Sequence, residues 1–168
     1  RKLVSVNCFG VHILWCNIIS TMLFLSSDHG GYRLKKQLAA FLDSLKVTYK
    51  DLGPFESDEN DDYPEYVLSL VTEVRKDPQN MGLVICRNGV GVSMMANRFK
   101  GIRAALSWDP KHAASTKNDD NTNVLALPAD YISLDAAKKI LVTWVETPFS
   151  EDERHTRRVN KVEEYGEK

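Results

Sequence analysis

Residues 81–97 read MGLVICRNGVGVSMMAN and contain a strand, a turn and a helix start in one short stretch. The run 81–86 is apolar throughout, which is typical of a strand buried on both faces of a sheet. Gly89 and Gly91 then permit backbone conformations that other residues avoid, and the segment 91–99 predicts a helix. A buried strand, a glycine turn and a helix in this order are the building unit of α/β folds with parallel sheets.

The same alternation extends through most of the chain. Strands are expected over 22–28, 47–53, 81–86, 101–108 and 122–128. Helices are expected over 31–45, 63–76, 91–99, 109–118 and 133–147, and a polar tail covers 148–168. The pattern predicts a doubly wound, Rossmann-like α/β fold, a three-layer sandwich around a five-stranded parallel sheet.

Length and composition are those of an ordinary globular domain. The chain has 168 residues, 43% hydrophobic and 27% charged, and a net charge of -1. This length is enough for one domain with its own core. Because there is no basic block, neither nucleic acid nor an anionic membrane surface is expected as a partner.

The number and spacing of the cysteines indicate the redox state of the cellular compartment. There are three, Cys8, Cys16 and Cys86, without paired C-x-x-C spacing. An odd number in this arrangement favours free thiols in a reducing compartment over a disulfide framework or a zinc site. We therefore expect a cytoplasmic protein.

The first 21 residues stand apart from this pattern. They contain the apolar stretch VHILWCNIIS (11–20), which is too short and too interrupted for a membrane span. We interpret 1–21 as an N-terminal extension, 22–162 as the domain and 163–168 as a polar C-terminal tail. The alternative is a signal or targeting segment, but cleavage just after the apolar run would cut into the first strand.

Polar residues follow the first predicted strand, at the sheet edge where α/β proteins bind ligands. Asp28 would accept hydrogen bonds from sugar hydroxyls, and His29 would donate to a hydroxyl or an anion. The alternative is that Asp28 only caps the next helix, and the local sequence alone slightly favours that interpretation.

Cys86 ends the third predicted strand. The positive end of the helix after it would bind an anion and lower the pKa of the thiol. The glycines fit neither a Walker loop nor a G-x-G-x-x-G motif, so by themselves they are a weak signal. Taken alone, a buried cysteine is more often a packing residue than a catalytic one.

The polar tail carries Arg154 and Arg158, four residues apart. On a helix they would face the same way and could bind a phosphate group. The alternative is a solvated basic helix end.

Together these segments resemble the ribose-5-phosphate isomerase B family, which includes the galactose-6-phosphate isomerase subunits. The matching pieces occur in family order and cover about residues 22–162. They are SDHGGYRLK (27–35), DLG (51–53), DYPEY (62–66), CRNGVGVSMMANRFKGIRAAL (86–106), NTNVLAL (121–127) and RHTRRV (154–159). Several segments in order are more specific than any one motif.

The resemblance implies aldose–ketose isomerisation of a sugar phosphate through a cis-enediol, with no metal and no cofactor. One branch of the family uses a cysteine base at the position of Cys86, and the other uses a glutamate where this chain has Val92. The chain therefore resembles the cysteine branch. The backbone N–H groups of Asn88, Gly89, Val90 and Gly91 would stabilise the enediolate oxygen.

The resemblance also assigns residues that bind the substrate. Asp28 matches the residue that holds substrate hydroxyls, and Tyr63 matches an active-site tyrosine. His29, Arg154 and Arg158 match phosphate contacts, with the two arginines reaching across from a second subunit. A homodimer or tetramer with shared sites is therefore expected.

The chain departs from the family pattern around the substrate. The usual Cys-Gly-Thr-Gly becomes Cys86-Arg87-Asn88-Gly89. The family's ring-opening histidine aligns with Asp119, which Asp120 follows, although an aspartate has a far lower ordinary pKa. A family arginine that contacts phosphate aligns with Asp130, and Arg87 is a candidate substitute.

These departures make the identity of the substrate less specific, whereas the expected fold and reaction class do not change. We expect an intramolecular oxidoreductase of carbohydrate metabolism that converts ribose 5-phosphate to ribulose 5-phosphate, a step of the pentose phosphate pathway. The alternatives are an isomerase of another pentose or hexose phosphate, or a sugar-phosphate-binding subunit that depends on a partner chain.

Overall fold

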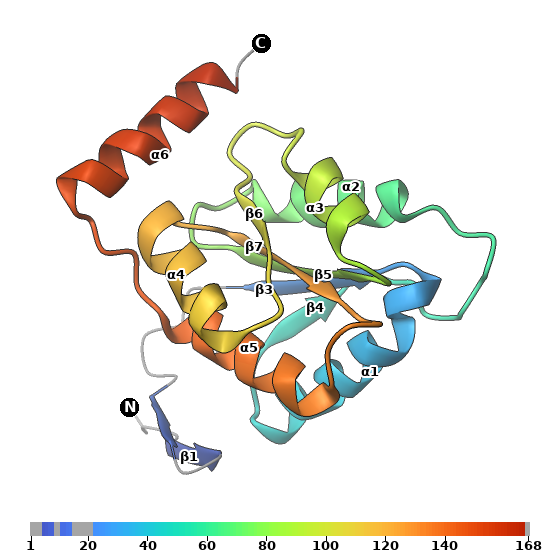
Figure 1. The fold of residues 1–168 in the computed structure, drawn as a ribbon. Coiled ribbons are helices and arrows are strands. Elements are labelled where there is room, and N and C mark those ends of the chain that lie inside the picture. Colours follow the sequence, from blue (N-terminus) through green and yellow to red (C-terminus); the bar gives the residue numbers. More distant parts are fainter. Residues whose placement is uncertain (1–4, 9–10, 15–21, 167–168) are drawn as a thin grey trace.

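The computed structural model describes residues 5–8, 11–14 and 22–166 and has a five-stranded parallel sheet at its centre (Figure 1). The strands lie in the order β4-β3-β5-β7-β6. Their bounds are β3 (Leu23–Ser27), β4 (Tyr49–Asp51), β5 (Met81–Cys86), β6 (Ala104–Leu106) and β7 (Val124–Pro128). The predicted doubly wound α/β sandwich is confirmed.

Helices cover both faces of the sheet (Figure 1). They are α1 (His29–Ser44), α2 (Tyr63–Val74), α3 (Val90–Ala96), α4 (Pro110–Asp120), α5 (Leu134–Glu146) and α6 (Glu153–Tyr165). Side chains of α1, α4 and α5 form one apolar cluster with the sheet, and those of α2 and α3 form the other. β3 shows the alternation, since Leu23 and Leu25 join the first cluster and Phe24 the second.

The N-terminal segment contributes a separate antiparallel pair, β1 (Ser5–Cys8) and β2 (Val11–Leu14). The rest of the expected extension 1–21 lies outside the described residues, as do the last two residues of the expected tail 163–168. Within the described part of the chain, every helix is too short or too polar to cross a membrane.

Three expected elements differ from those observed. The strand expected over 101–108 is reduced to Ala104–Leu106, because Gly101 has a φ of 81° that breaks extended pairing. The strand expected over 47–53 ends at Asp51, because Gly53 has a φ of 96°. The polar tail, in which only the spacing of Arg154 and Arg158 suggested a helix, forms α6, which lies beside α4 at the margin of the sandwich in Figure 1.

Two local features bring α1 close to the site at the carboxyl edge of the sheet. Asp28 is the N-cap of α1, and its Oδ1 accepts a hydrogen bond from the Gly31 backbone N–H at 2.9 Å. A Cβ on Gly31 would lie 2.3 Å from the backbone oxygen of Ile85, so only glycine allows this approach of α1 to β5.

Candidate active site

Neighbouring strands bring Asp28 and Cys86 to the same edge of the sheet. β3 and β5 pair in parallel with Ser27 opposite Ile85. Asp28 directly follows β3 and Cys86 is the last residue of β5, so the two lie side by side at this edge. The Asp28 backbone N–H donates to the Ile85 carbonyl at 3.2 Å. Both residues are buried, Asp28 with 8% and Cys86 with 5% of their surface exposed.

The turn after β5 wraps around the Cys86 sulfur. The Gly89 backbone N–H donates to Sγ at 3.1 Å, and the Asn88 Oδ1 lies 3.8 Å from Sγ. Asn88 Oδ1 also accepts from the Val90 N–H at 3.0 Å, which stabilises the turn. Gly89 has a φ of 72°, in the left-handed region that favours glycine.

The expected lowering of the Cys86 pKa is wrong. Burial is the largest influence and raises the pKa of the thiol, and the negative charge of Asp28 adds to the rise. Backbone N–H groups of Val92, Gly89 and Asn88 lower the pKa, but they do not outweigh burial. In the free protein at neutral pH, Cys86 is therefore a thiol, and the thiolate is a minority form.

His29 is held by a carboxylate that the sequence did not single out. Its Nδ1 lies 2.6 Å from Asp61 Oδ1, and the same oxygen accepts from the His29 backbone N–H at 3.2 Å. The hydrogen bond to Asp61 raises the pKa of His29. The acidic loop before Tyr63 was the one signal in the sequence, and it did not indicate which carboxylate turns inward.

Arg87 lies between α1 and the end of β7. Its aliphatic portion packs on Gly30, where a Cβ would lie 2.4 Å from the Arg87 Cγ. Its guanidinium forms a long ion pair with Asp130, at 3.7 Å, with both side chains at least half exposed. Arg87 and Asp130, two of the positions that depart from the family pattern, are thus spatial neighbours.

Tyr63 lies against the same turn. A Cβ on Gly91 would lie 2.8 Å from the Tyr63 Cζ, so the ring covers the backbone there. One chain thus places Asp28, His29, Tyr63, Cys86 and the turn 87–91 together, and we call this set the carboxyl-edge group.

The remaining predicted residues lie elsewhere. Asp119, Asp120, Arg154 and Arg158 form a second set, the α4–α6 group. α4 ends just before β7 begins, and Val124 of β7 pairs with Gly82, at the amino end of β5. Gly82 and Cys86 are four residues apart, which is about 13 Å along a strand.

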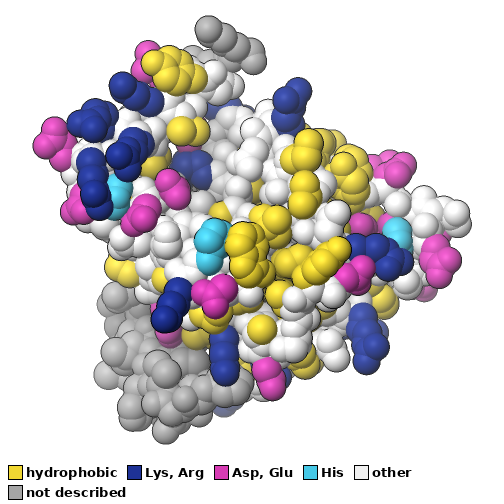
Figure 2. Space-filling model, in the orientation of Figure 1, with side chains coloured by type: hydrophobic (Ala, Val, Ile, Leu, Met, Phe, Trp, Pro, Cys, Tyr) yellow, Lys and Arg dark blue, Asp and Glu magenta, His cyan; other side chains and the backbone are white. Residues whose placement is uncertain are grey.

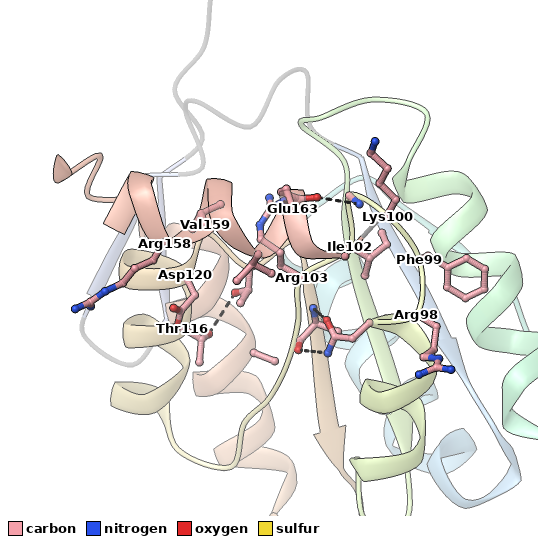
Figure 3. A pocket seen from close by; sticks show the side chains of 17 residues that line it. Arg98, Phe99, Lys100, Ile102, Arg103, Thr116, Asp120, Arg158, Val159 and Glu163 are labelled. Carbon is pink, nitrogen blue, oxygen red and sulfur yellow. Dashed lines mark hydrogen bonds and ion pairs between the residues drawn. The ribbon is translucent and has the colours of Figure 1, made fainter. Parts of the chain in front are cut away.

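The α4–α6 group has its own surroundings. Asp119 Oδ1 lies 3.9 Å from Nδ1 of His155, a buried residue of α6. Asp120 and Arg158 line a pocket of about 430 Å³ between α6 and the segment 97–105. Figure 3 shows both side chains at this pocket with Glu163, which pairs with Arg103. A single chain does not bring this group to Cys86.

The described residues hold no set of three or more His, Cys, Asp or Glu side chains placed to bind a metal ion. The chemistry available at the carboxyl-edge group is that of a thiol, carboxylates, an imidazole with a raised pKa and backbone donors. The sequence model of a family described as Ribose/Galactose Isomerase matches residues 23–162.

The chain belongs to the ribose/galactose isomerase family. The resemblance inferred from the sequence segments is thereby confirmed, including the ribose-5-phosphate isomerase B relatives. The protein of Mycoplasma pneumoniae named "Probable ribose-5-phosphate isomerase B" is 39% identical over 143 residues, covering 85% of this chain and 93% of the relative. Ribose-5-phosphate isomerase B of Mycobacterium tuberculosis is 31% identical, covering 85% and 88%.

A solved structure of this family has the same fold. Ribose-5-phosphate isomerase B from Mycoplasma genitalium, crystallised with bound ribulose-5-phosphate, superposes with a TM-score of 0.84 at 37% identity. The match covers 87% of this chain and 96% of that one. The similarity therefore spans the whole sandwich and both residue groups.

Proposed function

We propose that the chain isomerises a sugar phosphate, with ribose 5-phosphate to ribulose 5-phosphate as the leading reaction and Cys86 as the base. The observation that carries the proposal is the position of the Cys86 thiol, buried at the end of β5 beside Asp28 and enclosed by the turn 87–91. Support for the substrate comes from relatives named ribose-5-phosphate isomerase B, one of them crystallised with ribulose-5-phosphate.

In the proposed reaction, the Cys86 thiolate removes the proton from C2 of the open-chain aldose and the electron pair forms the enediolate. The same sulfur then returns a proton to C1, while the proton of the C2 hydroxyl passes to the C1 oxygen, so the C2 carbonyl forms and the thiolate is regenerated. Backbone N–H groups of residues 88–91 stabilise the oxygen that becomes negative. Because the pKa of Cys86 is raised, the rate should increase with pH until the thiolate dominates.

Asp28 serves both as a cap and as a substrate ligand in this proposal. Its Oδ1 is committed to the Gly31 N–H, in agreement with the capping alternative, and this fixes the carboxylate beside Cys86. The second oxygen would accept from a sugar hydroxyl. The Tyr63 ring, packed on Gly91, would line the same space.

Arg87 is proposed to contact the phosphate group. Family members carry a cation at the position of Asp130, and here the cation stands at position 87, within 3.7 Å of Asp130. The positive charge is therefore at position 87 in this chain, whereas family members carry it at the position of Asp130. Binding of a phosphate would compete with Asp130 for the guanidinium, and this pair is exposed and weak.

A second copy of the chain is proposed to supply the α4–α6 group. Asp119 and Asp120 would act on the sugar, and the exposed Arg154 and Arg158 would bind its phosphate. Large apolar side chains are exposed at the edge that would be covered, among them Tyr63, Val90, Met94 and Trp108. Figure 2 shows apolar side chains gathered over the middle of this face, which suits contact with another copy.

The domain 22–162, with 1–21 as an extension and 163–168 as a tail, is part of the proposal, as is a cytoplasmic location.

A second candidate is isomerisation of another pentose or hexose phosphate. It is favoured by Arg87 and Asn88, because they stand in place of the family's usual glycine and threonine in the turn that would contact the sugar. A partner-dependent binding subunit is a third possibility, for which Asp119 and Asp130 are the supporting departures.

A panel of aldose and ketose phosphates in D₂O tests the reaction. We expect NMR to show deuterium entering at C2 of ribose 5-phosphate, with weaker exchange for hexose phosphates. Unphosphorylated ribose is the matched control and should not exchange. Exchange with a hexose phosphate alone would favour the second candidate, and binding without exchange until another chain is added would favour the third.

A further inference from the structure

The carboxylate of Asp61 is buried in an unusual way for a loop residue. Its side chain is 5% exposed although it lies in the acid-rich segment before α2. Its Oδ1 contacts both the ring and the backbone N–H of His29. Its Oδ2 is buried without a well-formed hydrogen bond among the described residues, and the Asp61 carboxylate faces the Tyr66 hydroxyl, whose pKa it helps to raise.

A buried carboxylate with an oxygen that lacks a well-formed hydrogen bond is costly unless a positive charge compensates it. The His29 ring, when protonated, supplies such a charge, and its Nδ1 lies 2.6 Å from Asp61 Oδ1, a distance typical of charge-assisted hydrogen bonds. The amino end of α1 lies at the same point, since His29 is its first residue, and its dipole favours the same carboxylate. A neutral histidine would leave Asp61 without this compensation.

We propose that Asp61 is a positioning residue: it commits Nδ1–H of His29 and keeps the ring cationic, so that Nε2–H is the donor for the substrate phosphate. Nε2 makes no hydrogen bond within the described chain and is therefore available. This inference rests on the proposed sugar-phosphate function. It goes beyond it by assigning a residue in the loop before α2 to the phosphate site.

The charges that face His29 come from three elements. Asp61, from the loop before α2, and Asp28, the cap of α1, both raise the pKa of His29, whereas Arg87, after β5, lowers it. Asp61 is the largest of these influences. Without it, burial and Arg87 would both favour a neutral ring and only Asp28 would oppose them, so the phosphate site would lose positive charge.

The test uses the matched variants Asp61→Asn and Asp62→Asn. The amide of Asp61→Asn can still accept from Nδ1–H and from the backbone, so it removes the charge and keeps the shape. Asp62 is exposed and makes no side-chain cap for α2, so Asp62→Asn changes the net charge equally without touching His29. Ring resonances of the four histidines are followed by NMR, with His29→Gln identifying the His29 signal.

We expect the wild-type ring to titrate above the ordinary value of 6.5, Asp61→Asn to titrate at a lower pH than wild type, and Asp62→Asn to be unchanged. At pH 7, inorganic phosphate should shift the His29 signal, and Asp61→Asn should need several-fold more phosphate. Equal titration midpoints for the two variants would overturn the proposal.

The wild-type titration alone also decides the matter if Asp61→Asn does not fold. A His29 ring that titrates at or below 6.5 would overturn the proposal without any variant. Since these measurements need no turnover, they are separate from the proposed reaction. A protein that isomerises nothing but shows the His29 shifts would refute the isomerase function and support the role of Asp61.

Discussion

At Cys86, burial and local hydrogen bonds act in opposite directions on one side chain. The sequence places a cysteine before a glycine turn and a helix, which predicts a lowered thiol pKa. The structure shows that the sulfur is almost fully enclosed and that Asp28 lies nearby, so the pKa is raised instead. Burial depends on tertiary packing, and this is why the sequence alone gave the wrong direction.

Alkylation by iodoacetamide tests this direction. We expect the reaction of native Cys86 to reach half its maximal rate at a higher pH than in the urea-unfolded chain, because only the thiolate reacts. The peptide that contains Cys86 is followed by mass spectrometry, which separates it from the other two cysteines. Slow access would lower the rate at every pH but would not move the midpoint. A native midpoint below the unfolded one would refute the raised pKa.

Asp61 and Arg87 show another limit at the residue scale. Arg87 was visible in the sequence as a departure from the family turn, and the structure adds its contact with Asp130. The role of Asp61 could not be predicted, because residues 56–62 contain five acidic side chains. Nothing in their order indicates which one turns inward. The fold of the loop decides it.

At the scale of elements, the apolar runs predicted the strands β3, β5 and β7 well. Each is buried along its whole length, so its sequence signal is continuous. The edge strands β4 and β6 are only three residues long and half buried, and their predicted ends were too generous. Glycines with positive φ limit both regions, Gly101 before β6 and Gly53 after β4, and their conformation could not be derived from the sequence.

The close contact of α1 with β5 makes a prediction about stability. We expect Gly31→Ala to lower the free energy of unfolding by about 1–3 kcal/mol, because the added methyl would lie 2.3 Å from the Ile85 backbone oxygen. Alanine is the better helix former, so the loss would come from the clash alone. Chemical denaturation measures it, with Gly166→Ala as a control at the open end of α6. Equal stability of Gly31→Ala and wild type would show that α1 can move away freely.

At the scale of the whole molecule, one chain contains two separated groups of candidate residues. The sequence predicted the members of both groups and their sharing between subunits, but not the distance between them within a chain. That distance follows from the course of α4, which ends at the opposite edge of the sheet from Cys86. If both groups belong to one site, as proposed, that site needs two copies of the chain.

Mixing two inactive variants tests shared sites. Cys86→Ala and Arg158→Glu should each be nearly inactive alone, whereas a mixture refolded in equal amounts should regain about a quarter of wild-type activity. Half of the random dimers are mixed, and each mixed dimer has one intact site of two. Activity that equals the average of the two separate variants would refute the shared arrangement.

The central claim is that Cys86 transfers the proton between C2 and C1 of a sugar phosphate. The most direct measurement is deuterium exchange into ribose 5-phosphate in D₂O, followed by NMR for wild type and Cys86→Ala, with alanine variants of Cys8 and Cys16 as controls. We predict that Cys86→Ala loses about 10³-fold or more of the exchange rate while its affinity for ribose 5-phosphate stays within a few-fold. Exchange by Cys86→Ala at close to the wild-type rate would contradict the claim.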